Sequence, residues 1–109
     1  MCKMINATFF RNEYGKIYGF KVANHGTQIV CAAVSALTIN AVNGIKYLAN
    51  EKVNLRSCEK CGVIEATVPK LAQGSENRDA ELLLNSLLLG LMEIEKEYSK
   101  HIKITERKK

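Results

Sequence analysis

The residue types best suited to chemistry in this 109-residue chain are a cysteine and a histidine six positions apart, Cys31 and His25. A thiolate sulfur is a strong nucleophile and an imidazole can take and return its proton, so the pair suits attack on an acyl carbon. Gly26, between them, supplies backbone freedom for a loop that brings the imidazole back to the sulfur. Spacing alone leaves a second interpretation open, in which Cys31 is a buried structural cysteine and His25 an exposed loop residue.

A predicted helix over residues 29–49 provides the setting for Cys31. Apolar side chains recur there at steps of three and four, as a buried helix face requires: Val30, Val34, Leu37, Ala41, Ile45 and Leu48. Near the start of this helix, unpaired amides and the positive end of the helix dipole stabilise a thiolate and can donate to an oxyanion. Ser35, one turn after Cys31, hydrogen-bonds either toward the site or to a backbone carbonyl.

Alternating residues predict strands on both sides of this helix. The expected strands are residues 4–10 and 17–22 in one hairpin, 53–56 and 62–68 in a second, and a short strand at Ile102 and Ile104. A second helix begins after the N-cap Ser75, and its wide apolar face includes Leu82, Leu89 and Met92, which favours a homodimer contact. The order ββαββαβ predicts one α+β domain over residues 1–109, with two long helices on a mainly antiparallel sheet.

Composition excludes several classes of protein. Hydrophobic residues make up 47% of the chain, charged residues 25%, and the net charge is +5, which fits an ordinary globular domain. The uncharged run 22–45 is long enough for a membrane span, but polar side chains are spread through it, so we predict no membrane contact. We recognise no secretory signal peptide and no nucleotide-binding or zinc-hydrolase motif.

The four cysteines do not form a disulfide framework in a chain of this length and composition, which favours a reducing, cytoplasmic location. Cys58 and Cys61 form a C-x-x-C at the tip of the second predicted hairpin. Zinc would need two further ligands, and a redox motif would need its first cysteine at a helix start. We therefore predict no metal and no cofactor and interpret the pair as incidental, with a metal or redox protein as the weaker alternative.

One block of sequence carries a specific family resemblance. The run IVCAAVSALTINAVNGI at residues 29–45 resembles the start of the first helix in the Prp (YsxB-like) family of bacterial ribosomal-processing cysteine proteases. The element order, the chain length and the acidic run MEIEKEY at residues 92–98 are also similar, so the resemblance covers essentially the whole chain. It implies a small cytoplasmic homodimer that removes the N-terminal extension of large-subunit ribosomal protein twenty-seven. It also implies that Cys31 is the nucleophile, and it maps the family serine onto Ser35.

The loop before the cysteine departs from the family pattern, which is Gly-His-Ala, a variable loop, and then Asp-Ile-Val-Cys. This chain has a shortened loop, Asn24-His25-Gly26, and Gln28 in place of the aspartate. Two alignments stay open. His25 is either the family's catalytic histidine brought closer by a deletion, or a later loop residue in a chain that has lost that histidine.

His25 is the only histidine before Cys31, so we predict a Cys31–His25 dyad supported by Ser35 and Gln28. An extended ribosomal-protein peptide would lie across the loop residues Asn24, Gly26 and Thr27 and order the loop on binding. The alternative function is a catalytically impaired binding module of the same fold that associates with the ribosome.

Overall fold

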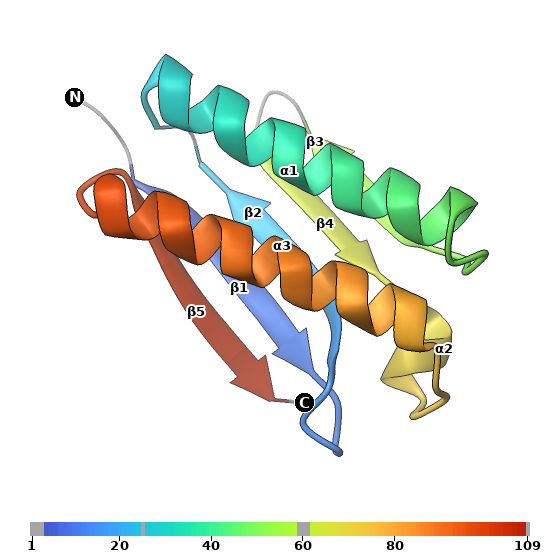
Figure 1. The fold of residues 1–109 in the computed structure, drawn as a ribbon. Helices are drawn as coiled ribbons and strands as arrows, with labels where there is room; N and C mark the ends of the chain where they lie inside the picture. The colour runs from blue at the N-terminus through green and yellow to red at the C-terminus, as the bar shows by residue number, and fades with distance from the viewer. Residues whose placement is uncertain (1–3, 25, 59–61, 109) are drawn as a thin grey trace.

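Two long helices cover one face of a five-stranded sheet in the computed structural model, which describes residues 4–24, 26–58 and 62–108 (Figure 1). The elements are β1 (Ile5–Arg11), β2 (Ile17–Ala23), α1 (Gln28–Tyr47), β3 (Asn54–Cys58), β4 (Val63–Thr67), α2 (Pro69–Ala72), α3 (Arg78–Glu97) and β5 (Ile102–Lys108). The expected order is confirmed, with the one-turn helix α2 as an addition.

The strands are arranged in the order β3-β4-β2-β1-β5. Three neighbouring pairs are antiparallel, and only β1 and β5 run parallel. The mainly antiparallel α+β arrangement predicted from the sequence is therefore confirmed. The parallel pair brings the chain end back beside the first strand, so that the Ile5 amide donates to the His101 carbonyl at 2.9 Å just before β5.

The core lies between the sheet and the helices. Phe9 of β1 and Phe20 of β2 are directly opposite each other and fully buried. Helix α3 lays its expected apolar stripe on the sheet through Leu84, Leu87 and Leu91, and the adjoining apolar residues Leu82, Leu89 and Met92 are exposed. The helix therefore has one face in the core and a second apolar strip facing outward.

The start of α3 differs from the sequence prediction. Its N-cap is Asn77 rather than Ser75, and the Asn77 side chain accepts a hydrogen bond from the Ala80 amide at 3.1 Å. The same side chain donates to the Ala49 carbonyl and to the Glu51 carboxylate. An amide can accept at the cap and donate elsewhere with two separate atoms, so Asn77 also ties α3 to the chain segment that follows α1.

Helix α1 buries most of its predicted face, including Val30, Val34 and Ile45. Leu48 is an exception: it caps the C-terminus, and its side chain is 75% exposed. Among the described helices, α1 alone is long and apolar enough to cross a membrane by length and composition. In this fold it packs beside α3, and its buried residues belong to the same core.

Candidate active site

The start of α1 is built by a side-chain cap. Thr27 is the N-cap, and its hydroxyl oxygen accepts a hydrogen bond from the Val30 amide at 3.4 Å. The Thr27 carbonyl accepts from the Cys31 amide at 2.8 Å, so Cys31 is the fourth residue of the helix. The Cys31 amide is therefore already used, and Gln28 and Ile29 carry the amides that precede these bonded ones at the helix end.

The Cys31 sulfur points back over the first turn, as side chains in a helix do. It lies 3.1 Å from the Gly26 nitrogen, which donates a hydrogen bond to it. The thiol donates in turn toward the Gly26 carbonyl oxygen at 3.6 Å. Cys31 is a free cysteine and half-buried. Its sulfur is thus held by the loop between β2 and α1.

The reversal of that loop falls on a different residue from the one expected. Asn24 adopts a positive φ of 74°, whereas Gly26 is not among the described residues with positive φ. Asparagine tolerates this conformation better than most residues. Gly26 matters for another reason. A Cβ atom there would lie 3.2 Å from Ile5 Cδ1 and 3.3 Å from the His101 carbonyl oxygen.

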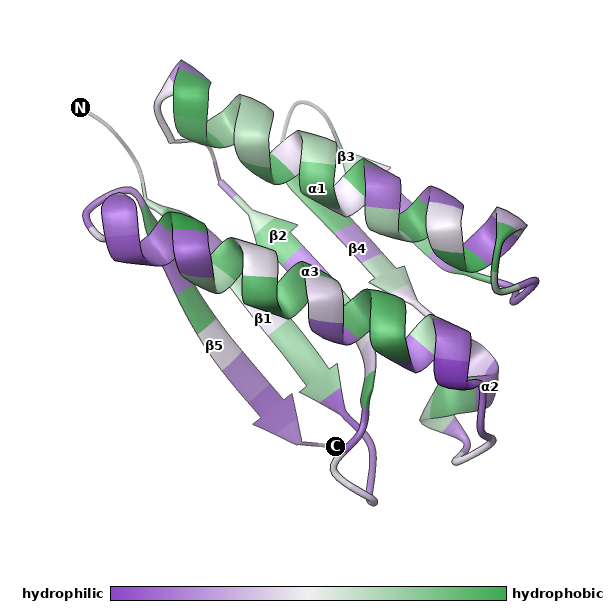
Figure 2. Ribbon diagram, viewed as in Figure 1, coloured by the Kyte–Doolittle hydropathy of each residue, from purple (hydrophilic) through white to green (hydrophobic). Residues whose placement is uncertain are grey.

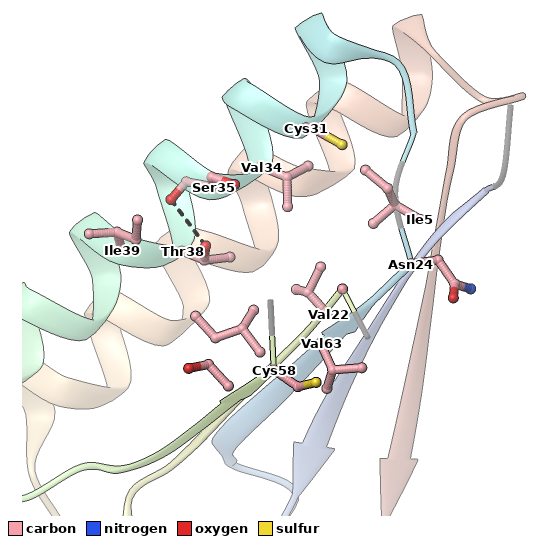
Figure 3. Close-up of a pocket in the computed structure, with 13 residues that line it drawn as sticks. Ile5, Val22, Asn24, Cys31, Val34, Ser35, Thr38, Ile39, Cys58 and Val63 are labelled. Carbon is pink, nitrogen blue, oxygen red and sulfur yellow. Dashed lines mark hydrogen bonds between the residues drawn. The ribbon is translucent and has the colours of Figure 1, made fainter. Parts of the chain in front are cut away.

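A cavity of about 420 Å³ lies between α1 and the strands, with Cys31 on its wall. Figure 3 shows the sulfur projecting from α1 on the side of Ile5 and Asn24, with Cys58 across the cavity on the strand side. Much of the lining is apolar and comes from α1 and the ends of β2 and β4: Val22, Val34, Ile39, Val63 and Ile64. An apolar side chain of an extended peptide fits such a lining.

The predicted supporting residues lie in different places. Ser35 lines the cavity one turn beyond Cys31. Its carbonyl accepts a hydrogen bond from the Thr38 hydroxyl at 3.1 Å, which satisfies that buried hydroxyl (Figure 3). Gln28 is exposed at the first position of α1 and does not line the cavity. Of the loop residues, Asn24 lines the cavity and Thr27 is the cap.

The two histidines differ in how the structure treats them. His25 lies outside the described residues, so the predicted dyad with Cys31 is not tested. The His101 backbone lies beside Gly26, but its side chain is not part of the cavity lining with Cys31. The His101 Nδ1 atom is buried and has no hydrogen-bond partner.

Cys58 departs from the sequence interpretation. It is disulfide-bonded, so the view of the C-x-x-C as an incidental pair in a disulfide-free chain is wrong for Cys58. A disulfide sulfur has no thiolate to offer a metal. Cys61 lies outside the described residues. The sequence carried no sign that Cys58 would line the same cavity as Cys31, because that depends on how the second hairpin lies against α1.

A free thiol in the first turn of a helix, beside an apolar cavity open to solvent, is the arrangement expected of a cysteine hydrolase. Comparison with known proteins agrees. The family profile described as "Cysteine protease Prp" matches residues 4–103. The chain therefore belongs to this family and is by that membership a cysteine endopeptidase, as the resemblance predicted.

Individual relatives are similar over nearly their whole length. The ribosomal processing cysteine protease Prp of Bacillus subtilis (strain 168) is 30% identical over 94% of this chain and 96% of its own. A crystal structure of the S. aureus ribosomal processing protease Prp with a covalently linked product peptide has a TM-score of 0.85 and 27% identity. It covers 95% of this chain and 100% of that chain. A second S. aureus Prp structure, with a substrate peptide, also has a TM-score of 0.85, at 26% identity and the same coverage.

Proposed function

We propose that this protein removes the N-terminal extension of large-subunit ribosomal protein twenty-seven, with Cys31 as nucleophile and His25 as general base. The observation that carries the proposal is the Cys31 sulfur, free and half-buried at the start of α1 on the wall of an apolar cavity. Support also comes from the relatives, which are named as ribosomal processing proteases and include peptide complexes.

The reaction follows from these groups. His25 takes the thiol proton, the Cys31 sulfur attacks the scissile carbonyl carbon, and the electron pair of the carbonyl moves onto its oxygen. The amides of Gln28 and Ile29 at the helix start are the donors for this oxyanion, because the Cys31 amide is already bonded to Thr27. The C–N bond then breaks, and the new amine leaves with the proton from His25. Water hydrolyses the thioester and restores the thiol.

Substrate selection in this proposal rests on shape and apolar contact. The cavity beside Cys31 is lined largely by aliphatic side chains of α1 and the strand ends. The chain itself is basic, with a net charge of +5, so a basic ribosomal-protein tail gains little from long-range attraction. Ile39, half exposed at 53% on the cavity wall, is one such contact.

The direct test is cleavage of a peptide that spans the ribosomal-protein extension. We expect the wild-type protein to cut it, and Cys31→Ala and His25→Gln to lose the activity. His101→Gln is the matched control, because it removes the chain's other imidazole, which does not line the cavity. If wild type and Cys31→Ala give the same result, the proposal is wrong. If only His25→Gln retains activity, another group is the base.

The alternative is a binding module with the same fold and without peptidase activity. It is motivated by Gln28, which stands where the family has an aspartate and is exposed at the helix start. An ordinary thiol is almost fully protonated at pH 6 and alkylates slowly. Alkylation of Cys31 at pH 6 no faster than in the denatured protein would favour the module.

The proposal includes a homodimer in the bacterial cytoplasm, close to the ribosome and not in contact with the membrane. Leu82, Leu89 and Met92 support the dimer, since they lie on the outward side of α3 with exposed fractions of 67%, 63% and 47%. An apolar strip of this kind is typical of a contact surface. Sedimentation analysis should give the mass of two chains, and Leu89→Lys should shift it to one. A monomeric wild type would refute this part alone.

A further inference from the structure

We propose that Gly26 is a positioning residue: its backbone N–H holds the Cys31 sulfur as a reactive thiolate, and its packing requires glycine. The inference rests on the proposed role of Cys31 as nucleophile. It concerns the atom that stabilises the sulfur before any substrate binds, a task that neither predicted supporting residue performs. Gln28 is outside the cavity, and the Ser35 hydroxyl has no hydrogen bond to the sulfur among the described residues.

The first step is the contact itself. The Gly26 nitrogen is 3.1 Å from the Cys31 sulfur, while the Gly26 carbonyl oxygen is 3.6 Å away. The amide attracts a negative sulfur and the carbonyl repels it, and the amide is the closer group. Hydrogen bonds to an ionised atom are roughly twice as strong as those between neutral groups. The contact therefore favours the thiolate over the thiol.

The second step is the packing that places this amide. A Cβ atom on Gly26 would lie 3.2 Å from Ile5 Cδ1, 3.3 Å from Ile5 Cγ1 and 3.3 Å from the His101 carbonyl oxygen. These neighbours cannot easily move away. Ile5 is 1% exposed, and its amide is bonded to that same carbonyl. Any side chain at position 26 must therefore shift the loop by a few tenths of an ångström and lengthen the bond to sulfur.

The third step is a kinetic signature. Stabilising a thiolate increases the fraction present at low pH but lowers the intrinsic reactivity of each thiolate. Loss of the Gly26 contact should thus slow Cys31 at pH 6 and leave it as fast or slightly faster at pH 9.5. A variant that is merely misfolded or blocks access to the sulfur would change the rate by the same factor at both values.

The experiment measures the rate constant for alkylation of Cys31 by iodoacetamide in the folded protein at both pH values, with Cys31→Ala to subtract other sites. For Gly26→Ala we expect about a tenfold fall at pH 6, the effect of one weakened charge-assisted hydrogen bond, and no fall at pH 9.5. Gly90→Ala is the matched control. Its new Cβ would be as close, 3.1 Å, to the flexible Leu37 Cδ1, away from Cys31, and the rate should stay unchanged.

A rescue variant separates positioning from general damage. Ile5→Val removes Cδ1, the atom nearest to the new methyl group, so Gly26→Ala/Ile5→Val should regain much of the rate relative to Ile5→Val alone. The same pair carries the test if Gly26→Ala by itself does not fold. An unchanged rate at pH 6, or an equal fall at both pH values without rescue, would overturn the inference. Alkylation needs no peptide, so failure of peptide cleavage bears on the proposed function and leaves this result readable.

Discussion

The two long helices have the same length, 20 residues, and lie side by side, yet they differ in almost every other respect. Figure 2 shows α1 mainly hydrophobic over its first half, whereas hydrophilic and hydrophobic residues alternate along α3. Helix α3 has Asp79 and Glu81 in its first turn, which complement the helix dipole, whereas α1 has no acidic residue there. The positive end of α1 is thus left for another anion, and Cys31 is the side chain beside it.

The contacts of the helices differ in the same sense. Helix α3 packs on β2 and β5, while α1 packs mainly on α3 and leaves a cavity between itself and the strands. One helix therefore contributes chiefly to stability, and the other forms the wall of a site. This division predicts that substitutions in α1 near Cys31 change chemistry more than stability, and that substitutions in the α3 stripe do the reverse.

The largest expected effect is on chemistry. Cys31→Ser should lower peptide cleavage by about 10⁴-fold or more, the loss found when a nucleophile is removed from a hydrolase. Because Cys31 is only half-buried and serine is similar in size, the free energy of unfolding should change by less than about 1 kcal/mol. Cleavage assays and urea unfolding on the same preparation check both. A large loss of stability would show that Cys31 is a core residue after all.

The complementary change is Leu84→Ala in α3. Leu84 is 1% exposed, so the cavity left behind should cost about 3 kcal/mol of unfolding free energy. The folded fraction should retain the wild-type rate of Cys31 alkylation, because the change lies in the other helix. Leu82→Ala, at an exposed position of the same helix, is the control and should cost little. If Leu84→Ala also slows Cys31, the division between the helices is not real.

The two N-caps provide a finer comparison. Asn77→Ala should cost about 2 kcal/mol, since it removes the cap bond at 3.1 Å and two donor bonds to the segment after α1. Thr27→Ala loses one bond of 3.4 Å and should cost about 0.5 kcal/mol. Only Thr27→Ala should alter the alkylation rate of Cys31, because its loop leads to Gly26. Equal costs in urea unfolding would contradict this ranking.

The smallest effect concerns the sheet that supports both helices. Burial, and secondarily the nearby Glu65 charge, raises the pKa of Tyr18 above its ordinary value of 10.0. The folded state thus favours the neutral phenol. Its contribution to stability is complete below pH 10 and is lost as the pH rises through the folded-state pKa. Tyr18→Phe should make unfolding less pH-dependent above pH 10. Tyr14→Phe, at an exposed position, should not.

Much of the fold was predictable because it depends on local patterns. Strand alternation and the three-to-four spacing in α1 and α3 depend on near neighbours in the chain, and the elements appear close to the expected positions. The errors occur where a distant partner decides. Asn77 caps α3 because it also reaches Ala49 and Glu51, and Leu48 turns to solvent because α1 ends one residue earlier.

For the site, the sequence alone determined which residue types stand near the start of α1: a cysteine in the first turn, a threonine cap and a glycine before it. Tertiary structure decided what each one does. Gly26 lies against Ile5 and His101, residues from the two ends of the chain, and this places its amide on the Cys31 sulfur. Cys58 shares the cavity with Cys31 because a hairpin distant in the sequence lies opposite α1. Such contacts depend on long-range packing, for which a local pattern carries no signal.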